Sequence, residues 1–157
     1  MIENWDNEVK NFIHLCDKEG VRMLMVGGGA VNFHGYQRHS ADVDFWLETT
    51  ADNFKRLVNV FSGMGYDIDD FPDIVKKQQQ NISVKFSPAS MEVELITNFS
   101  VNRPFDEVYN ESVDASLETN PSVKWKVLNF EDLITSKVKA GRPKDLLDIQ
   151  QLREIKK

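Results

Sequence analysis

Short stretches of alternating apolar and polar residues predict β-strands along the chain. Residues 42–47, reading DVDFWL, alternate most clearly, and residues 82–86 and 91–97 follow the same period of two. The latter two stretches are separated by the turn sequence SPAS, so they predict a hairpin. An apolar run that ends at Val26, before three glycines, predicts another strand, and residues 66–68 are a further candidate.

Helical periodicity fills most of the remaining chain. One helix is predicted to end near Glu19, and others are predicted over residues 30–34, 51–61 and 131–139. Gly141 suits a C-terminal stop after the last of these, because glycine adopts the left-handed conformation that ends many helices. A second helix directly after this stop would complete a C-terminal helical pair.

The final helix is predicted to begin at Pro143, which suits a first helical turn. Its apolar stripe is predicted to pack on the sheet, which leaves Lys144 and Asp148 on another side. The stripe consists of Leu146, Ile149, Leu152 and Ile155.

Strands interleaved with helices indicate an α+β fold, with a mixed central sheet flanked by helices and a C-terminal helical pair. The chain has 157 residues, of which 41% are hydrophobic. This length supplies one core and leaves little room for a second. We therefore expect a single domain over residues 1–157.

Charge and cysteine content narrow the classes of partner. A net charge of −6 argues against duplex DNA as a partner, although a local basic patch could hold an RNA end. The single cysteine, Cys16, lies in an amphipathic segment and is interpreted as a core thiol. No secretory segment opens the chain, and no apolar run approaches the roughly twenty residues of a membrane span. We expect a cytoplasmic protein that does not bind membranes.

Three glycines, Gly27, Gly28 and Gly29, stand between the apolar run and the first short helix. Without a Cβ atom, such a turn lets a phosphate approach the main chain, and the start of the following helix favours an anion. The glycines match neither the Walker loop nor the dinucleotide fingerprint. They predict a phosphate-binding turn, with an ordinary tight turn as the alternative.

Two carboxylates follow this turn. Asp42 and Asp44 are two residues apart, so they point the same way from a strand. They would repel each other without a cation, and Mg²⁺ prefers such oxygen ligands and completes its shell with water and substrate phosphates. The pair predicts a divalent metal site, with ordinary surface acids as the alternative. Trp46 is two residues after Asp44 and so lies on the same face of the strand. It is interpreted as a packing residue, with stacking on a nucleobase as the alternative.

Together these residues resemble the nucleotidyltransferase superfamily, whose best-known member is the beta-type DNA polymerase. Its signature joins an apolar residue and two small residues, here Val26, Gly27 and Gly28, to an acidic pair that alternates with apolar residues, here 42–45. More narrowly, GGGAVNFHG followed by RHSADVD resembles small bacterial nucleotidyltransferase-like proteins related to abortive-infection toxins and antibiotic adenylyltransferases.

The resemblance implies further nucleotide-binding residues. Arg38 and Ser40 fall where those proteins often carry an arginine and a serine or threonine, and a surface salt bridge is the alternative role for the arginine. Residues 137–157 hold seven Lys or Arg against three Asp or Glu, which suits a polyphosphate. The alternative is that the Lys and Arg side chains of residues 137–157 only complement helix C-termini and nearby acidic residues. The positions that match the family pattern there are Lys137, Arg142, Lys144, Asp145 and Asp148.

The superfamily also needs a third carboxylate from a neighbouring strand. Glu92 and Glu94 share one face of the stretch 91–97, and Glu94 is preferred because two aliphatic residues follow it, as in relatives. Relatives commonly have aspartate at this position. Glutamate reaches one methylene further and could ligate a metal or act as general base for an attacking hydroxyl.

The resemblance implies a Mg²⁺-dependent nucleotidyltransferase with a two-metal site, for which Mn²⁺ is an alternative ion. It would transfer a nucleoside monophosphate, expected to be AMP from ATP, to a hydroxyl and release pyrophosphate. The acceptor could be a small molecule, an RNA end or a protein, and a homodimer or a cognate protein partner could complete its pocket. The alternative is a catalytically silent nucleotide-binding or toxin–antitoxin module on the same scaffold.

Overall fold

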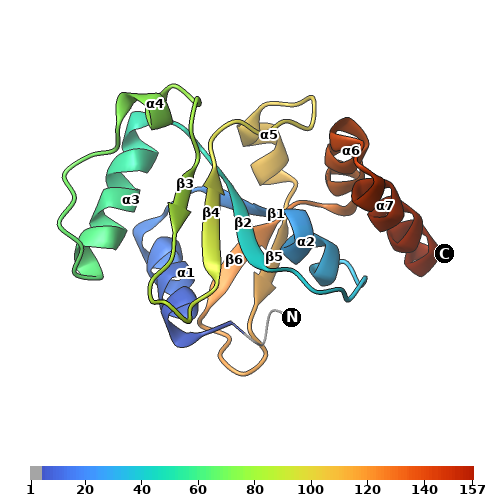
Figure 1. Ribbon diagram of the computed structural model, residues 1–157, viewed down its shortest axis with the longest axis horizontal. Coiled ribbons are helices and arrows are strands. Elements are labelled where there is room, and N and C mark those ends of the chain that lie inside the picture. The colour runs from blue at the N-terminus through green and yellow to red at the C-terminus, as the bar shows by residue number, and fades with distance from the viewer. Residues whose placement is uncertain (1–4) are drawn as a thin grey trace.

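A six-stranded mixed sheet with the order β3-β4-β2-β1-β6-β5 forms the centre of the fold (Figure 1). The computed structural model describes residues 5–157, so the first four residues of the expected domain lie outside it. Three pairs of neighbouring strands are antiparallel and two are parallel, which confirms the predicted mixed sheet and α+β class. The strands are β1 (Met23–Val26), β2 (Asp42–Leu47), β3 (Ile82–Val84), β4 (Glu92–Ile96), β5 (Val113–Ser116) and β6 (Lys124–Val127).

Helices lie at both ends of this sheet. Figure 1 shows α1 and α3 beside the β3 edge and the pair α6 and α7 at the opposite end of the molecule. Phe12 of α1 stacks on Phe61 of α3 with ring centroids 5.6 Å apart, so α1 and α3 pack against each other. The helices are α1 (Asn7–Glu19), α2 (Gly27–Phe33), α3 (Ala51–Gly63), α4 (Asp73–Lys76), α5 (Phe105–Asn110), α6 (Phe130–Ala140) and α7 (Pro143–Lys156).

Local signals fix the ends of the C-terminal pair. The side chain of Asn129 accepts a hydrogen bond from the backbone N–H of Asp132 at the start of α6. Gly141 ends α6 in the left-handed conformation, with φ 62°, and Pro143 is the first residue of α7. The predicted stop and restart are therefore confirmed, and the turn between the two helices is only two residues long.

The two faces of the sheet differ in character. Val43, Phe45 and Leu47 of β2 are buried on one face, which α2 covers through the contact of Gly29 with Met25. Alternation places Asp42, Asp44 and Trp46 on the other face. There Trp46 packs on Phe99 and Phe105, with ring centroids 5.3 and 5.0 Å apart. The acidic pair thus projects from the face opposite the α2 layer.

Several features differ from the sequence-based expectation. The helix predicted over residues 30–34 begins earlier, at Gly27, so the three glycines form the first turn of α2. Residues 66–68 form no strand, and Tyr66 is exposed. The short strands β5 and β6 were not predicted. In α7 only Ile149 and Leu152 of the expected apolar stripe are buried; Leu146 and Ile155 are half exposed, whereas Asp148 is buried. The final helix therefore turns an acidic residue inward.

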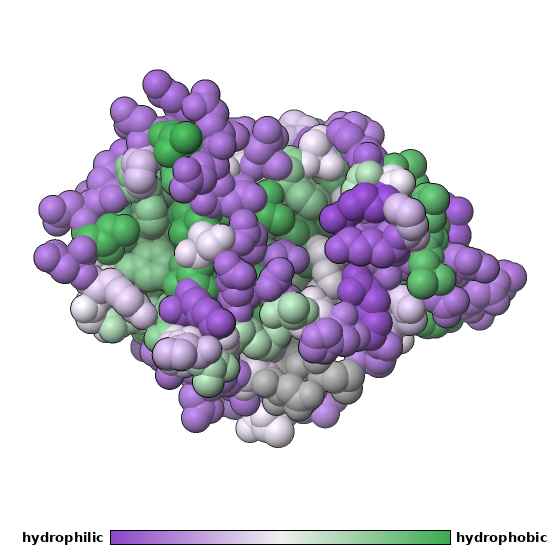
Figure 2. All heavy atoms as spheres, in the orientation of Figure 1, coloured by the Kyte–Doolittle hydropathy of each residue, from purple (hydrophilic) through white to green (hydrophobic). Residues whose placement is uncertain are grey.

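Apolar side chains also reach the surface of the C-terminal pair. Figure 2 shows green patches among the purple surface at this end of the molecule. No helix within residues 5–157 has the length and apolarity needed to cross a membrane. The exposed large apolar residues of α6 and α7 are Val138, Leu146, Leu147 and Ile155.

Candidate active site

The glycine turn and the acidic strand are in direct contact. Gly27 begins α2 with φ 63°, and a Cβ atom placed there would lie 2.6 Å from a carboxylate oxygen of Asp44. Only glycine fits this conformation and this spacing. No side chain caps the start of α2, so its first backbone N–H groups have no side-chain acceptor at the turn. The Asp44 carboxylate and the first backbone N–H groups of α2 therefore lie at the same point of the molecule.

A short strap, residues 38–40, crosses the same turn. A Cβ atom at Gly28 would lie 2.4 Å from the hydroxyl of Ser40, so glycine is required there as well. The Ser40 hydroxyl donates to the carbonyl of Asp42 at 3.0 Å, and the backbone N–H of Arg38 donates to the side chain of Asn32 at 3.0 Å. These bonds hold the strap between the turn and the acidic strand.

Four carboxylates lie on adjacent strands of the same sheet face. In the parallel register of β2 with β4, Asp42 is opposite Glu92 and Asp44 is opposite Glu94. Neighbouring strands are about 4.8 Å apart, so each pair lies side by side. The predicted hairpin of β3 with β4 is confirmed, and it brings Glu94 next to Asp44 as expected.

Glu94 has a hydrogen-bond partner of its own. Its carboxylate accepts from the hydroxyl of Ser83 at 2.5 Å. Across the described part of the chain, no three His, Cys, Asp or Glu side chains already have the spacing of a metal site. Asp42, Asp44 and Glu94 therefore do not already form a three-carboxylate metal site in this structure. The two aspartates alone, completed by phosphate oxygens and water, remain a suitable set for Mg²⁺.

The acidic face is electrostatically uncompensated. Burial, Asp42 and Glu94 raise the pKa of Asp44 from 3.8 to about 6, and the more distant Lys137 and Lys144 only partly oppose this. A cation next to Asp44 would remove the repulsion, because an opposite charge favours the ionised carboxylate. The chemistry of this donor set therefore fits a hard divalent cation.

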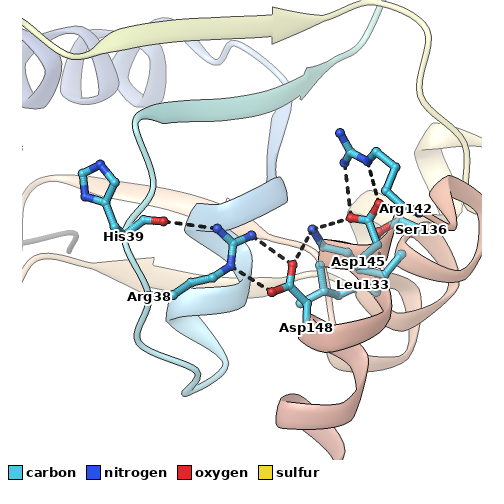
Figure 3. Close-up of polar contacts among 8 residues, drawn as sticks. Arg38, His39, Leu133, Ser136, Arg142, Asp145 and Asp148 are labelled. Carbon is cyan, nitrogen blue, oxygen red and sulfur yellow. Dashed lines mark hydrogen bonds and ion pairs between the residues drawn. The ribbon is translucent and has the colours of Figure 1, made fainter.

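Five residues form a chain of ion pairs, which we call the cation network (Figure 3). Arg38 binds Asp148 through two N–H groups at 2.8 and 2.9 Å. Lys137 contacts Asp148 at 3.0 Å and Asp145 at 3.2 Å, and Arg142 binds Asp145 through Nε at 2.6 Å. The network joins the strap, α6 and α7, which explains why α7 turns its aspartates inward.

The two aspartates of the network are buried, and each is paired with two cations. Burial opposes the ionisation of Asp145, but hydrogen bonds from Arg142 and Lys137 outweigh it and hold the pKa of this carboxyl below its usual value. Lys137 is itself buried, with 5% of its surface exposed. Because three cations share two carboxylates, the network keeps one net positive charge beside the acidic face.

A cleft of about 480 Å³ lies between the glycine turn, the acidic strand and the cation network. Its volume is within the range of small-molecule sites. Gly29 does not line it, because this glycine faces Met25 in the core, and Glu94 also lies outside the lining. The predicted site residues that do line the cleft are Gly27, Gly28, Arg38, Ser40, Asp42, Asp44, Lys137, Arg142 and Lys144.

The comparison with known families agrees with this arrangement. Residues 6–157 match a family described as "Nucleotidyl transferase of unknown function (DUF2204)". The chain belongs to this nucleotidyl transferase family. No curated protein matches the chain. Since the family match spans nearly the whole sequence, it includes the glycine turn, the acidic strand and the C-terminal pair together.

The structure also shows what the sequence-based prediction missed. Asp148 belongs to the C-terminal motif, yet its role in holding Arg38 was not anticipated, because 110 residues separate the two. Ile96 and Phe99 also line the cleft and were not predicted. Phe99 carries no motif, so only the fold places it there.

Proposed function

We propose that the protein is a Mg²⁺-dependent nucleotidyltransferase that transfers AMP from ATP to a hydroxyl group and releases pyrophosphate. One observation carries this proposal: the Asp44 carboxylate lies against the backbone of Gly27, and a cationic wall faces both across the same cleft. A metal–polyphosphate complex needs carboxylates on one side and positive charge on the other. The membership of the nucleotidyl transferase family supports the same class of reaction.

In this proposal Asp42 and Asp44 hold the metal. Bound Mg²⁺ would neutralise phosphate charge and clamp the attacking and leaving oxygens, with Mn²⁺ as an alternative ion and two ions as the expected number. The mutual repulsion of the carboxylates supports this role, because a bound cation would relieve it. Asp42 is the more exposed of the two and leaves room for water in the shell.

The polyphosphate would lie along the turn and the network. The backbone N–H groups at Gly27 and Gly28, at the uncapped start of α2, would donate hydrogen bonds to its oxygens. Arg38 is held at this turn by Asp148, so its guanidinium is already oriented. Arg142 and Lys144 line the cleft from the start of α7 and would offset the charge of the departing pyrophosphate.

Lys137 would act mainly through its neighbours. Its amine contacts two buried carboxylates, so it orients Asp145 and Asp148 and, through them, the two arginines. Its positive charge is close enough to Asp44 to lower the pKa of that carboxyl. We therefore assign Lys137 an electrostatic and positioning role, instead of a direct bond to phosphate.

Glu94 is the preferred group for accepting the proton of the attacking hydroxyl or for completing the metal shell. Its register opposite Asp44 favours it over Glu92, which lies opposite Asp42 and is exposed. Comparing Glu94→Gln with Glu92→Gln in a turnover assay separates the two. The proposal expects a large loss only for the first variant.

A second candidate function is a catalytically silent nucleotide-binding or toxin–antitoxin module. The surroundings of Glu94 favour it, because this carboxylate already accepts a hydrogen bond from Ser83 and does not line the cleft. Such a module would bind ATP through the same turn and network without releasing pyrophosphate. A cognate protein partner or a second copy of the chain would then be the functional target.

Pyrophosphate release from each NTP, with Mg²⁺ and with or without cellular RNA, distinguishes the two candidates. The first predicts release from ATP that requires Mg²⁺ and that Asp42→Asn abolishes. Nucleotide binding without release would favour the silent module. Equal release by Asp42→Asn and the wild type would refute the metal assignment. Labelling a cell extract with radioactive ATP would then identify whether the acceptor is a small molecule, an RNA or a protein.

A further inference from the structure

One wall of the cleft is apolar, although most of its lining is charged or glycine. Ile96 and Phe99 form this wall at the end of β4, and Phe99 is the largest apolar side chain that lines the cleft. Phe99 is only partly buried. A phenyl ring left accessible inside a polar cleft is suited to contact a flat, weakly polar part of a ligand.

Phe99 is backed by a second aromatic layer. Its ring packs on Trp46 with centroids 5.3 Å apart, and Trp46 in turn packs on Phe105. Trp46 is 7% exposed and does not line the cleft. The alternative that Trp46 itself stacks on a base therefore does not fit, because Phe99 and Phe105 cover it. Of these three rings, Phe99 is the one that lines the cleft.

The loop that carries Phe99 is held by the residues that directly follow it. Val101 is buried. Lys139 of α6 donates hydrogen bonds to the side chains of Ser100 at 3.0 Å and Asn102 at 2.9 Å. Arg103 pairs with Asp132 at the start of α6 at 2.6 Å. These contacts position the ring before any ligand arrives, which lowers the entropic cost of binding against it.

The distance from the acids suits a nucleoside. Ile96 is two residues beyond Glu94 in β4 and pairs with Trp46, which is two residues beyond Asp44 in β2. Two residues span roughly 7 Å along a strand. The apolar wall thus begins about one sugar length from the carboxylates that would hold the metal at the phosphates.

We propose that Phe99 is the stacking platform for the base of the nucleotide, with Ile96 beside it. This inference rests on the proposed function and adds the binding mode of its substrate. Stacking on a phenyl ring tolerates every base but favours the larger purines, because every base has a π-face and purines offer more area. ATP and GTP should therefore bind more tightly than CTP and UTP, and the affinity of the phosphate part alone should not depend on Phe99.

Titration calorimetry of the full chain with Mg²⁺ and a non-hydrolysable ATP analogue, in parallel with inorganic tripolyphosphate, tests this assignment. The key variant is Phe99→Leu, which keeps an apolar cover over Trp46 but removes the π-face. We expect it to weaken binding of the ATP analogue about fivefold or more, the low end of base–aromatic stacking, and to leave tripolyphosphate binding unchanged. Phe99→Trp should retain the affinity of the wild type.

Equal losses for both ligands would overturn the assignment, since they would make Phe99 a structural residue. Unchanged binding of the ATP analogue by Phe99→Leu would overturn it as well. In both cases the proposed transfer reaction would stand, because the wild type still binds the nucleotide. Failure of the wild type to bind either ligand would refute the proposed function and the stacking platform together.

Discussion

The two walls of the cleft handle charge in opposite ways. On the sheet, Asp42, Asp44 and Glu94 repel one another, and the pKa of Asp44 is raised to about 6. On the C-terminal pair, buried Asp145 is fully matched by cations, and the pKa of its carboxyl is lowered. In the proposed function, a divalent cation from solution would neutralise the first wall. The second wall already contains its cations and holds the fold around the cleft.

This difference separates residues that act on a ligand from residues that act on the structure. A carboxylate without a partner costs stability in the free protein and gains a partner when the metal binds. A buried ion pair costs little while it is intact but a great deal when one partner is removed. Removing a charge should therefore stabilise the metal-free protein in the first wall and destabilise it in the second.

The largest effect on stability is expected for Lys137→Ala. The change leaves two buried aspartates without the amine that bridges them, and it should lower the free energy of unfolding by about 3–5 kcal/mol. Urea denaturation measures it. The matched control is Arg142→Ala, which should cost about 1 kcal/mol or less, because this side chain is 59% exposed and Asp145 keeps Lys137. Equal costs for both variants would contradict a network centred on Lys137.

Asp44→Asn should separate activity from stability. Loss of a metal ligand should reduce pyrophosphate release at least about 100-fold, since even outer-shell partners of metals cost 10–100-fold. Removal of the uncompensated charge should nevertheless raise the melting temperature of the metal-free protein at pH 8. Mg²⁺ should stabilise the wild type and not the variant.

Asp67→Asn is the control for this change, because Asp67 is exposed and far from the acidic strand in sequence. It should change neither the rate of pyrophosphate release nor the melting temperature of the metal-free protein. A metal-free Asp44→Asn variant that melts below the wild type at pH 8 would show that the carboxylates are not a destabilising cluster.

Gly27→Ala should distort the point at which the two walls meet. A methyl group there would lie 2.6 Å from the Asp44 carboxylate in a left-handed backbone conformation, and the strain should cost about 2 kcal/mol. Thermal or urea unfolding measures the loss. Gly63→Ala is the control, because no atom lies within 4 Å of the added methyl group and its helical backbone tolerates alanine. A Gly27→Ala variant as stable as the Gly63→Ala variant would refute the close contact.

The smallest of the four effects should appear on acidification. Asp44 has a folded-state pKa of about 6, above its ordinary 3.8, so its contribution to stability is present below pH 3.8 and is lost as pH rises through 6. Metal binding runs the other way, because the ligand must be ionised. Mg²⁺ affinity should therefore fall about tenfold between pH 7 and pH 5 in calorimetric titrations. A flat profile over this range would contradict the raised pKa.

Short-range patterns allowed much of the fold to be predicted. The alternation in residues 42–47 and 91–97 located β2 and β4, and the glycine and proline signals located the turn between α6 and α7. Strands β5 and β6 were missed because each has only four residues, which leaves a period of two little length in which to stand out.

Long-range pairing explains the remaining differences. Leu146 and Ile155 match a helical apolar stripe but are half exposed, whereas Asp148 is buried because Arg38 and Lys137 neutralise it. Periodicity reports burial of apolar residues and cannot reveal a buried charge whose partner lies 110 residues away. The same limit hid Phe99, which reaches the cleft from an irregular loop.

The central claim is that Asp42 and Asp44 hold a divalent cation at the glycine turn. The most direct test is anomalous diffraction from crystals grown with Mn²⁺ and a non-hydrolysable ATP analogue. We expect a manganese peak bonded to both aspartates, with phosphate oxygens of the analogue against the backbone of Gly27 and Gly28. A nucleotide bound in the cleft with no metal at these carboxylates, or a metal bound elsewhere, would contradict it.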